Sequence, residues 1–154
     1  MDIVERLNAH TTVGLDTPVF IYQLEAHPDY LPLTQALFTD VQAGRWAAIT
    51  STITLMELTV RPWQLDRPAV AREYETLLVH FPHLTILDVT RDVARRAAQL
   101  RAEYRLRPAD ALQIGTALVH GATAFVSNDR ALLRVAPTLD IVILEQLRTA
   151  DQLS

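Results

Sequence analysis

The sequence predicts an α/β fold: a single domain in which about five short, mainly parallel strands are flanked by helices. Short apolar runs alternate along the chain with longer segments of helical periodicity, the pattern of parallel strands joined by helical crossovers. The apolar runs mostly lack internal alternation, as expected for strands that are covered on both faces. With 154 residues, of which 49% are hydrophobic, the chain is long enough for one substantial core and short enough for one domain.

Each predicted strand is only a few residues long. We expect strands at residues 12–16, 46–50, 84–88, 122–127 and 140–144. The domain built on them should run from residue 12 to residue 148. Residues 1–11 form a predicted N-terminal extension, either an extra turn of helix or a loose segment, and residues 149–154 form a short polar tail.

Six helices are predicted around these strands, and their ends carry suitable capping residues. The helices are expected at residues 18–25, 33–43, 52–61, 67–80, 91–104 and 109–120. Suitable helix starts are Thr17 with Pro18, Asp66 with Pro68, and Thr90. Gly44 and Gly121 stand where a helix should end in a left-handed residue.

Composition excludes several classes of mechanism. The chain has no cysteine, which removes disulfides, thiolate nucleophiles and cysteine-ligated zinc. All fourteen basic residues are arginine, which removes the lysine of a phosphate-binding P-loop. A formal charge of -4 is unusual for binding nucleic acid by overall attraction, so such binding would depend on local arginine or on bound metal.

No segment approaches the roughly 20 uncharged apolar residues that span a bilayer. The first residues also lack the basic start and apolar stretch of a signal peptide. We therefore expect a cytoplasmic protein that does not enter a membrane.

Four acidic residues are placed where the predicted sheet would bind a ligand. In a parallel sheet the carboxyl ends of all strands lie at one edge, and ligands bind in the crevice beyond it. Asp16 ends the first predicted strand and Asp129 follows the fourth. Glu57 lies on the helix that leaves the second strand, and Asp110 lies in the first turn of the last predicted helix.

Each of these acids also has an ordinary structural explanation. Asp16 could cap the helix near Pro18, and Glu57 could pair with Arg61 four residues later. Asp110 could be placed by the helix dipole, and Asp129 could be a turn residue.

Taken together, however, the four carboxylates predict a cation, because converging carboxylates repel unless they share protons or hold a positive ion. Oxygen-only ligands favour Mg²⁺ or Mn²⁺. Such a metal keeps open positions for phosphate oxygens, lowers the pKa of a bound water and stabilises in-line attack on a phosphodiester. No protein nucleophile is then required.

Four stretches of the chain together resemble a PIN-domain nuclease, and within that family a VapC-type toxin. They are LDTPVFIY at 15–22, STITLMEL at 51–58, ADALQIGTA at 109–117 and FVSNDRAL at 125–132. Their order and spacing match from residue 12 to residue 144. Pro18 and Gln113 depart from what the resemblance leads us to expect, but neither removes a carboxylate.

The resemblance implies that Asp16, Glu57, Asp110 and Asp129 are the metal-binding and catalytic acids. Ser127 stands where the family often has a hydroxyl residue near the site, and Thr17 is a further helper. The implied activity is Mg²⁺- or Mn²⁺-dependent endonuclease cleavage of RNA, held inactive in toxins by a small antitoxin protein. The resemblance also implies a homodimer.

Two further segments each leave alternatives open. Residues 91–107 carry six arginines against two acids, and form either an ordinary solvated helix face or a rim that contacts RNA. The middle helices carry a set of large hydrophobic residues that suits the core, a second subunit or an antitoxin groove. These residues are Trp63, Leu65, Tyr74, Leu77, Leu78 and Phe81.

Three rival functions are considered. A phosphatase with an aspartyl nucleophile resembles a strand ending in Asp-x-Asp, but here Pro18 occupies the second position. An RNase H-like nuclease has antiparallel first strands, which fit the alternation poorly. The third is a catalytically silent PIN-like module that binds RNA or protein, against which the four intact acids argue only mildly.

Overall fold

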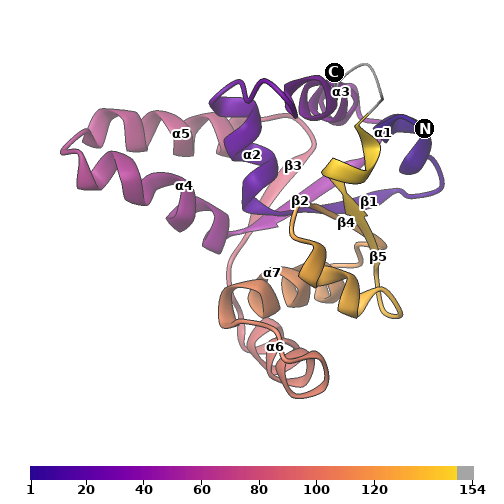
Figure 1. Ribbon diagram of the computed structural model, residues 1–154. Coiled ribbons are helices and arrows are strands. Elements are labelled where there is room, and N and C mark those ends of the chain that lie inside the picture. Colours follow the sequence, from indigo (N-terminus) through magenta and orange to yellow (C-terminus); the bar gives the residue numbers. More distant parts are fainter. Residues whose placement is uncertain (149–154) are drawn as a thin grey trace.

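The protein is built on a five-stranded sheet in which every pair of neighbouring strands is parallel, as the computed structural model of residues 1–148 shows (Figure 1). The strands are β1 (Thr12–Leu15), β2 (Ala47–Ser51), β3 (Leu84–Leu87), β4 (Ala124–Ser127) and β5 (Asp140–Ile143). The predicted α/β fold is confirmed. Each predicted strand is present, with both ends within two residues of those expected.

The order of the strands places a crevice at the centre of the sheet. The order is β3-β2-β1-β4-β5, so the chain runs outward from β1 to β3 and then returns to the other side of β1. The order therefore reverses between β1 and β4, and at such a switch point the loops leaving the two strands diverge. Asp16 follows β1 and Asp129 follows β4, so both lie at this point.

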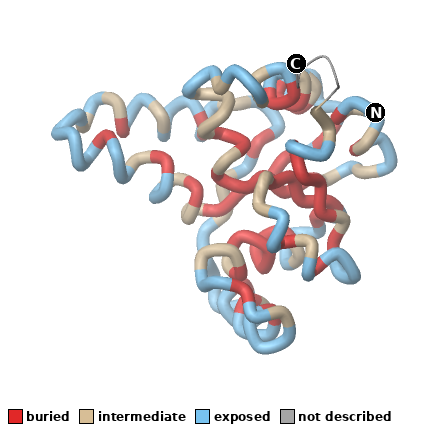
Figure 2. Tube along the Cα trace, viewed as in Figure 1, coloured by how far each residue is buried: buried red, intermediate tan, exposed pale blue. Residues whose placement is uncertain are grey.

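Helices cover both faces of the sheet (Figure 1). One layer contains α1 (Ile3–Arg6), α2 (Thr17–Leu24), α3 (Leu31–Gln42) and α5 (Pro68–His80). The other contains α6 (Arg91–Tyr104), α7 (Pro108–Val119) and the 3-10 helix η1 (Arg130–Val135). A second 3-10 helix, η2 (Leu144–Leu147), follows β5. Helix α4 (Thr52–Gln64) pairs with α5 in a hairpin that projects from the body, with mostly exposed residues towards its tip (Figure 2).

Alternate residues of each strand supply two hydrophobic cores, one on each side of the sheet, because successive side chains of a strand point to opposite faces. Val13 and Leu15 of β1 belong to the core under α2 and α3. Phe125 of β4 and Ile141 of β5 belong to the core under α6 and α7. Burial on both faces explains why the strands show no simple polar alternation in the sequence.

A glycine allows α6 and α7 to pack closely. A Cβ atom on Gly115 would lie 3.2 Å from the carbonyl oxygen of Val93 and 3.3 Å from the backbone nitrogen of Ala97, tighter than most contacts of that kind. This close approach packs the first half of α6 against the second half of α7. The predicted helix ends at Gly44 and Gly121 are confirmed, each with φ of 84°.

Two details of the predicted helices are wrong. Asp66 does not cap α5: it lies in the preceding turn with φ of 54°, and Arg67 is the N-cap residue. Helix α4 does not stop at Arg61 but continues through Pro62 to Gln64.

The ends of the chain add two observations. The segment before β1 contains a turn of helix, and its Ile3 and Leu7 are fully buried in the core. The predicted polar tail, 149–154, lies outside the described residues. Among the described residues, no helix combines the length and apolarity that crossing a membrane requires.

Candidate active site at the carboxyl edge of the sheet

Asp16 is the most deeply buried acid of the edge. It is the N-cap residue of α2, and its Oδ1 accepts a hydrogen bond of 2.9 Å from the backbone N–H of Thr17. Its side chain therefore does cap a helix, as the ordinary explanation holds. Only 6% of the residue is exposed, however, which is a costly position for a charge whose only task is capping.

Ser127 connects the ends of β1 and β4. Its hydroxyl donates to Oδ2 of Asp16 at 2.7 Å and accepts the backbone N–H of Asp129 at 3.1 Å. Ser127 itself is fully buried, so its orientation is fixed by these two partners. The serine thus holds the Asp16 carboxylate and the backbone of Asp129 in one arrangement at the switch point of the sheet.

Glu57 is joined to the same group from the first turns of α4. Its Oε1 accepts a hydrogen bond of 2.7 Å from the hydroxyl of Thr17, the residue next to Asp16. This contact, rather than an ion pair with Arg61, is the one the structure gives Glu57 within residues 1–148. Thr17 therefore positions Glu57 through its side chain and Asp16 through its backbone.

A buried network of hydrogen bonds holds the Thr17 side chain in place. The side-chain amide nitrogen of Gln113 donates to the hydroxyl oxygen of Thr54 at 2.8 Å and to that of Thr17 at 3.2 Å. The amide oxygen of Gln113 accepts the hydroxyl of Ser51 at 2.7 Å. Each of these groups is nearly or fully buried, and each has a partner, as a buried polar group requires.

In the sequence Gln113 is marked only as a departure from the family resemblance, and no sequence pattern predicts this network. The one signal in the sequence was a polar residue on the otherwise apolar face of α7, which does not by itself indicate a role. Its partners lie 59 and 96 residues away along the chain, so no local pattern could have connected them.

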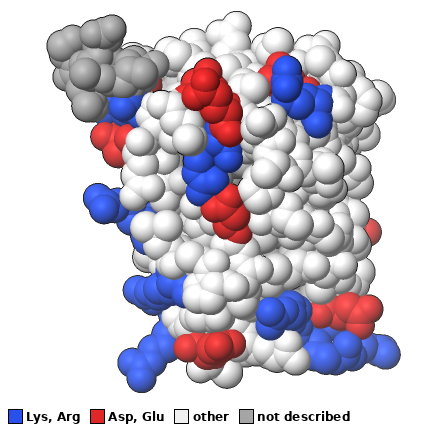
Figure 3. All heavy atoms as spheres, turned by 90° about the vertical axis from the view of Figure 1, so that its right-hand side faces the viewer, with Lys and Arg blue, Asp and Glu red and all other residues white. Residues whose placement is uncertain are grey.

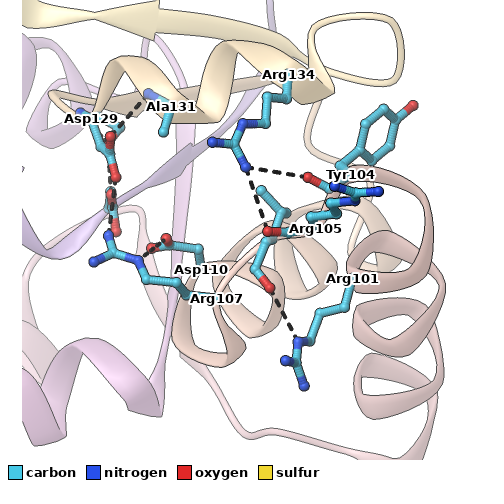
Figure 4. Close-up of polar contacts among 11 residues, drawn as sticks. Arg101, Tyr104, Arg105, Arg107, Asp110, Asp129, Ala131 and Arg134 are labelled. Atoms are coloured by element: carbon cyan, nitrogen blue, oxygen red, sulfur yellow. Dashed lines mark hydrogen bonds and ion pairs between the residues drawn. The ribbon is translucent and has the colours of Figure 1, made fainter.

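Asp110 and Asp129 form the second half of the edge, and Arg107 bridges them (Figure 4). The Nε of Arg107 lies 3.1 Å from Oδ2 of Asp110, and its Nη2 lies 3.2 Å from Oδ2 of Asp129. Oδ1 of Asp129 also accepts the N–H of Ala131 at the start of η1. The Arg107 side chain is 76% exposed, so both ion pairs are solvated and weak.

The electrostatics show that the two halves are neighbours. Burial raises the pKa of Asp16 from 3.8 to about 6, against the lowering effect of the hydrogen bonds from Ser127 and Thr17. The negative charges of Asp110 and Glu57 contribute a smaller part of the same rise. Asp16 is thus a partly desolvated carboxylate close to other carboxylates, which is the environment that a bound cation relieves.

The donor set fits a hard divalent cation, although the side chains do not converge on one point. All four acids offer oxygen, the ligand type that Mg²⁺ and Mn²⁺ prefer. Within residues 1–148, no three acidic or histidine side chains are grouped closely enough to hold a metal ion as they stand. Asp110 and Asp129 already have a positive partner, because both form ion pairs with the guanidinium group of Arg107, and this partner takes the place that a cation would occupy.

Comparisons with known proteins show the family and the fold of the chain. The PIN domain family matches residues 13–137, which is most of the chain. No curated protein matches the sequence. Solved structures do match: a toxin–antitoxin complex from Klebsiella pneumoniae is 22% identical, with a TM-score of 0.62, and the alignment covers 86% of this chain and 97% of that one.

Two further structures share the fold. DNA-bound VapBC from Salmonella typhimurium is 24% identical, with a TM-score of 0.66 over 87% of this chain and 98% of that one. FitAcB from Neisseria gonorrhoeae is 21% identical, with a TM-score of 0.68 over 88% of this chain and 99% of that one. At these identities the likeness shows a common fold.

Proposed function

The chain belongs to the PIN domain family, and on that premise we propose that it is a metal-dependent endoribonuclease that hydrolyses RNA phosphodiester bonds. The observation that carries the proposal is Asp16: a buried carboxylate whose pKa is raised to about 6, at the switch point of the sheet, beside Glu57 and Asp110. A buried acid held charged at neutral pH among other acids calls for a cation.

We assign the metal to Asp16, Glu57, Asp110 and Asp129, with Mg²⁺ or Mn²⁺ as the ion. When bound, the metal would supply an activated water and would neutralise charge on the phosphate under attack. The remaining side chains position the acids: Ser127 orients Asp16, and Thr17 orients Glu57. Neither Ser127 nor Thr17 is needed as a nucleophile.

A cleavage assay tests the proposal. RNA incubated with the purified protein should be cut when Mg²⁺ or Mn²⁺ is present and left intact in EDTA. Asp16→Asn should lower the rate by at least about a hundredfold, because it removes a proposed ligand of the cation, and loss of one preorganised electrostatic contact typically costs about that much. Asp140→Asn, an acid at the opposite edge of the sheet, is the matched control and should cut at the wild-type rate.

Rapid, metal-dependent cleavage by Asp16→Asn would overturn the assignment of the site. Metal-independent cleavage would overturn the mechanism. No cleavage of any RNA, with RNA binding intact, would instead establish the silent binding module.

We further propose that the enzyme acts in the cytoplasm as the toxin of a toxin–antitoxin pair, with a small antitoxin protein as its inhibitor. The projecting α4–α5 hairpin supports a protein partner. Of its large hydrophobic residues, Leu78 is buried in the core, whereas Trp63, Leu65 and Leu77 are 58%, 54% and 49% exposed. Exposed apolar side chains gathered on one hairpin are typical of a surface that another chain covers.

Growth and assembly test the toxin role. Expression of the chain alone should arrest growth, and expression of Asp16→Asn should not. A homodimer is the assembly we expect of the isolated chain, and light scattering of the purified protein measures it. Harmless expression of an active enzyme would contradict the toxin role while leaving the nuclease intact.

A further inference from the structure

A cavity adjoins the candidate site on the side of Asp110 and Asp129. Its volume is about 450 Å³, and it lies between the turn that joins α6 to α7 and the 3-10 helix η1. Three arginines, Arg105, Arg107 and Arg134, line it together with the two acids. The lining therefore carries both signs of charge: the two carboxylates with Arg107 between them, and the guanidinium groups of Arg105 and Arg134.

The fold brings these arginines together from two distant segments. Arg105 ends α6 in the left-handed conformation, with φ of 56°, and so turns the chain sharply towards α7. Arg134 reaches this turn from η1, and its Nη1 lies 3.5 Å from the carbonyl oxygens of Tyr104 and Arg105 (Figure 4). The Nε of Arg101 donates to the carbonyl of Leu106 at 3.1 Å, which holds the turn from the other side.

Of the three arginines, one forms ion pairs with acidic residues and two do not. Arg107 is paired with Asp110 and Asp129. Within residues 1–148, neither Arg105 nor Arg134 forms an ion pair, and the two carbonyl contacts of Arg134 are at the limit of a hydrogen bond. Both side chains are exposed, so their donors are available to an anion.

The other arginines of α6 differ from this pair. Arg95 is paired with Asp92 at 2.8 Å, and Arg96 donates to Gln99 at 3.2 Å, both on the open surface of the helix. On the face drawn in Figure 3, basic side chains are densest at the lower end, the end at which α6 and α7 lie in Figure 1. Within residues 1–148, Arg105 and Arg134 are thus positive charges without an acidic ion-pair partner, in a chain whose net charge is negative.

We propose that this cavity is a phosphate subsite, in which Arg105 and Arg134 bind the backbone phosphate of RNA next to the one at the carboxylates. The proposal rests on the proposed function, since it assigns a second contact to the same substrate. The planar guanidinium group suits a phosphate because two of its N–H groups can donate to two oxygens. Such a subsite would allow a protein of negative net charge to bind RNA, because the strand would lie where arginine is locally in excess.

RNA affinity measured without metal tests the subsite. Fluorescence anisotropy of a short labelled single-stranded RNA, in EDTA to prevent cleavage, gives the dissociation constant of wild type, Arg105→Gln and Arg134→Gln. Each substitution should weaken binding by about three- to tenfold. Each should also reduce the slope of log K against log salt by about 0.7, the value for one phosphate contact on a single strand.

Arg95→Gln is the matched control, because it removes the same charge from the same region but outside the cavity. It should change neither the affinity nor the slope. Thermal unfolding of all variants checks that each is folded, and the two independent subsite variants guard against a local defect in one of them.

The outcomes separate the two proposals. If wild type cleaves RNA with Mn²⁺ but Arg105→Gln and Arg134→Gln bind RNA as wild type does, the subsite is overturned and the nuclease stands. If Arg95→Gln weakens binding as much as the other two, diffuse charge rather than a subsite is responsible. If wild type neither binds nor cleaves RNA, both proposals fail.

Discussion

Both edges of the sheet carry carboxylates and arginine, but the acid at one edge has a lowered pKa and the buried acid at the other has a raised pKa. At the amino edge, Asp140 at the start of β5 receives both terminal nitrogens of Arg6, at 2.7 and 2.5 Å, and Nε2 of His10 at 2.8 Å. At the carboxyl edge, one guanidinium group is shared between Asp110 and Asp129, and within residues 1–148 Asp16 forms no ion pair, although the charge of Arg107 reaches it.

The pKa values record this difference. The Arg6 hydrogen bonds lower the pKa of Asp140, whereas burial raises that of Asp16 to about 6. An ionised acid whose pKa is lowered on folding stabilises the fold, and one whose pKa is raised on folding destabilises it. The amino edge is thus arranged for stability, whereas the carboxyl edge holds Asp16 at a raised pKa, which a bound cation would lower.

The largest expected effect is a gain in stability on removing the Asp16 charge. The pKa of Asp16 is higher in the folded protein than in the unfolded chain. Ionisation of Asp16 therefore lowers the free energy of unfolding increasingly as the pH rises from 3.8 to about 6 and by the full amount above that, and it has no effect well below pH 3.8. A rise from 3.8 to about 6 corresponds to about 3 kcal/mol at pH 7, since each pH unit is about 1.36 kcal/mol.

Asp16→Asn should therefore raise the free energy of unfolding by about 1–3 kcal/mol at pH 7, with the gain shrinking towards pH 4. Urea unfolding in EDTA at both pH values measures it. A variant less stable than wild type at pH 7 would show that the carboxylate is needed for the fold rather than for a ligand.

The second effect is a loss of cleavage in acid. Asp16 must be ionised to hold a cation, so the rate at low metal concentration should fall about tenfold for each pH unit below about 6. More metal should move the midpoint to lower pH, because the cation favours the ionised form. Rates between pH 5 and 7 at two Mn²⁺ concentrations measure this, and a flat profile would count against Asp16 as a ligand.

The third effect has the opposite sign to the first. The pKa of Asp140 is lowered, so its ionised form supports folding above pH 3.8, and that support is lost as the pH falls through the folded-state value. Asp140→Asn should cost about 1 kcal/mol at pH 7, a modest value because the ion pair with Arg6 is partly exposed. Urea unfolding measures it, and unchanged stability at pH 7 would remove the contrast between the edges.

The smallest effect is competition between Arg107 and the metal. Arg107 holds Asp110 and Asp129 through two exposed ion pairs, and a cation must displace it. Arg107→Gln should tighten Mn²⁺ binding by about two- to fivefold, the range expected of such pairs. Arg95→Gln is the control, and weaker Mn²⁺ binding by Arg107→Gln would mean that Arg107 assists the metal site.

Much of the fold could be predicted because its signals are local. Short apolar runs gave the strands, and capping residues such as Thr90 marked helix starts, as its hydroxyl contact with the N–H of Val93 confirms. The end of α4 was predicted wrongly at Pro62, because a proline in a helix costs a hydrogen bond but does not always end the helix. Asp66 misled because aspartate suits a left-handed turn as well as a cap.

The candidate site could be predicted only in part. Asp16 and Asp129 followed from the rule that parallel strands end at one edge, and they do lie there. The bridge by Arg107, the Gln113 network and the approach of Arg134 to the α6–α7 turn could not be inferred. Each depends on contacts between segments far apart in the chain, which no local spacing encodes.

On the proposed function, the carboxyl edge of the sheet binds a divalent cation and the amino edge does not. Titration of Mn²⁺ into the purified protein, followed by the electron paramagnetic resonance signal of the free ion, tests it directly. Wild type and Asp140→Asn should bind Mn²⁺ equally, and Asp16→Asn should bind it at least about tenfold more weakly, as expected on losing a charged oxygen ligand. Equal binding by wild type and Asp16→Asn, or none by wild type, would contradict the claim.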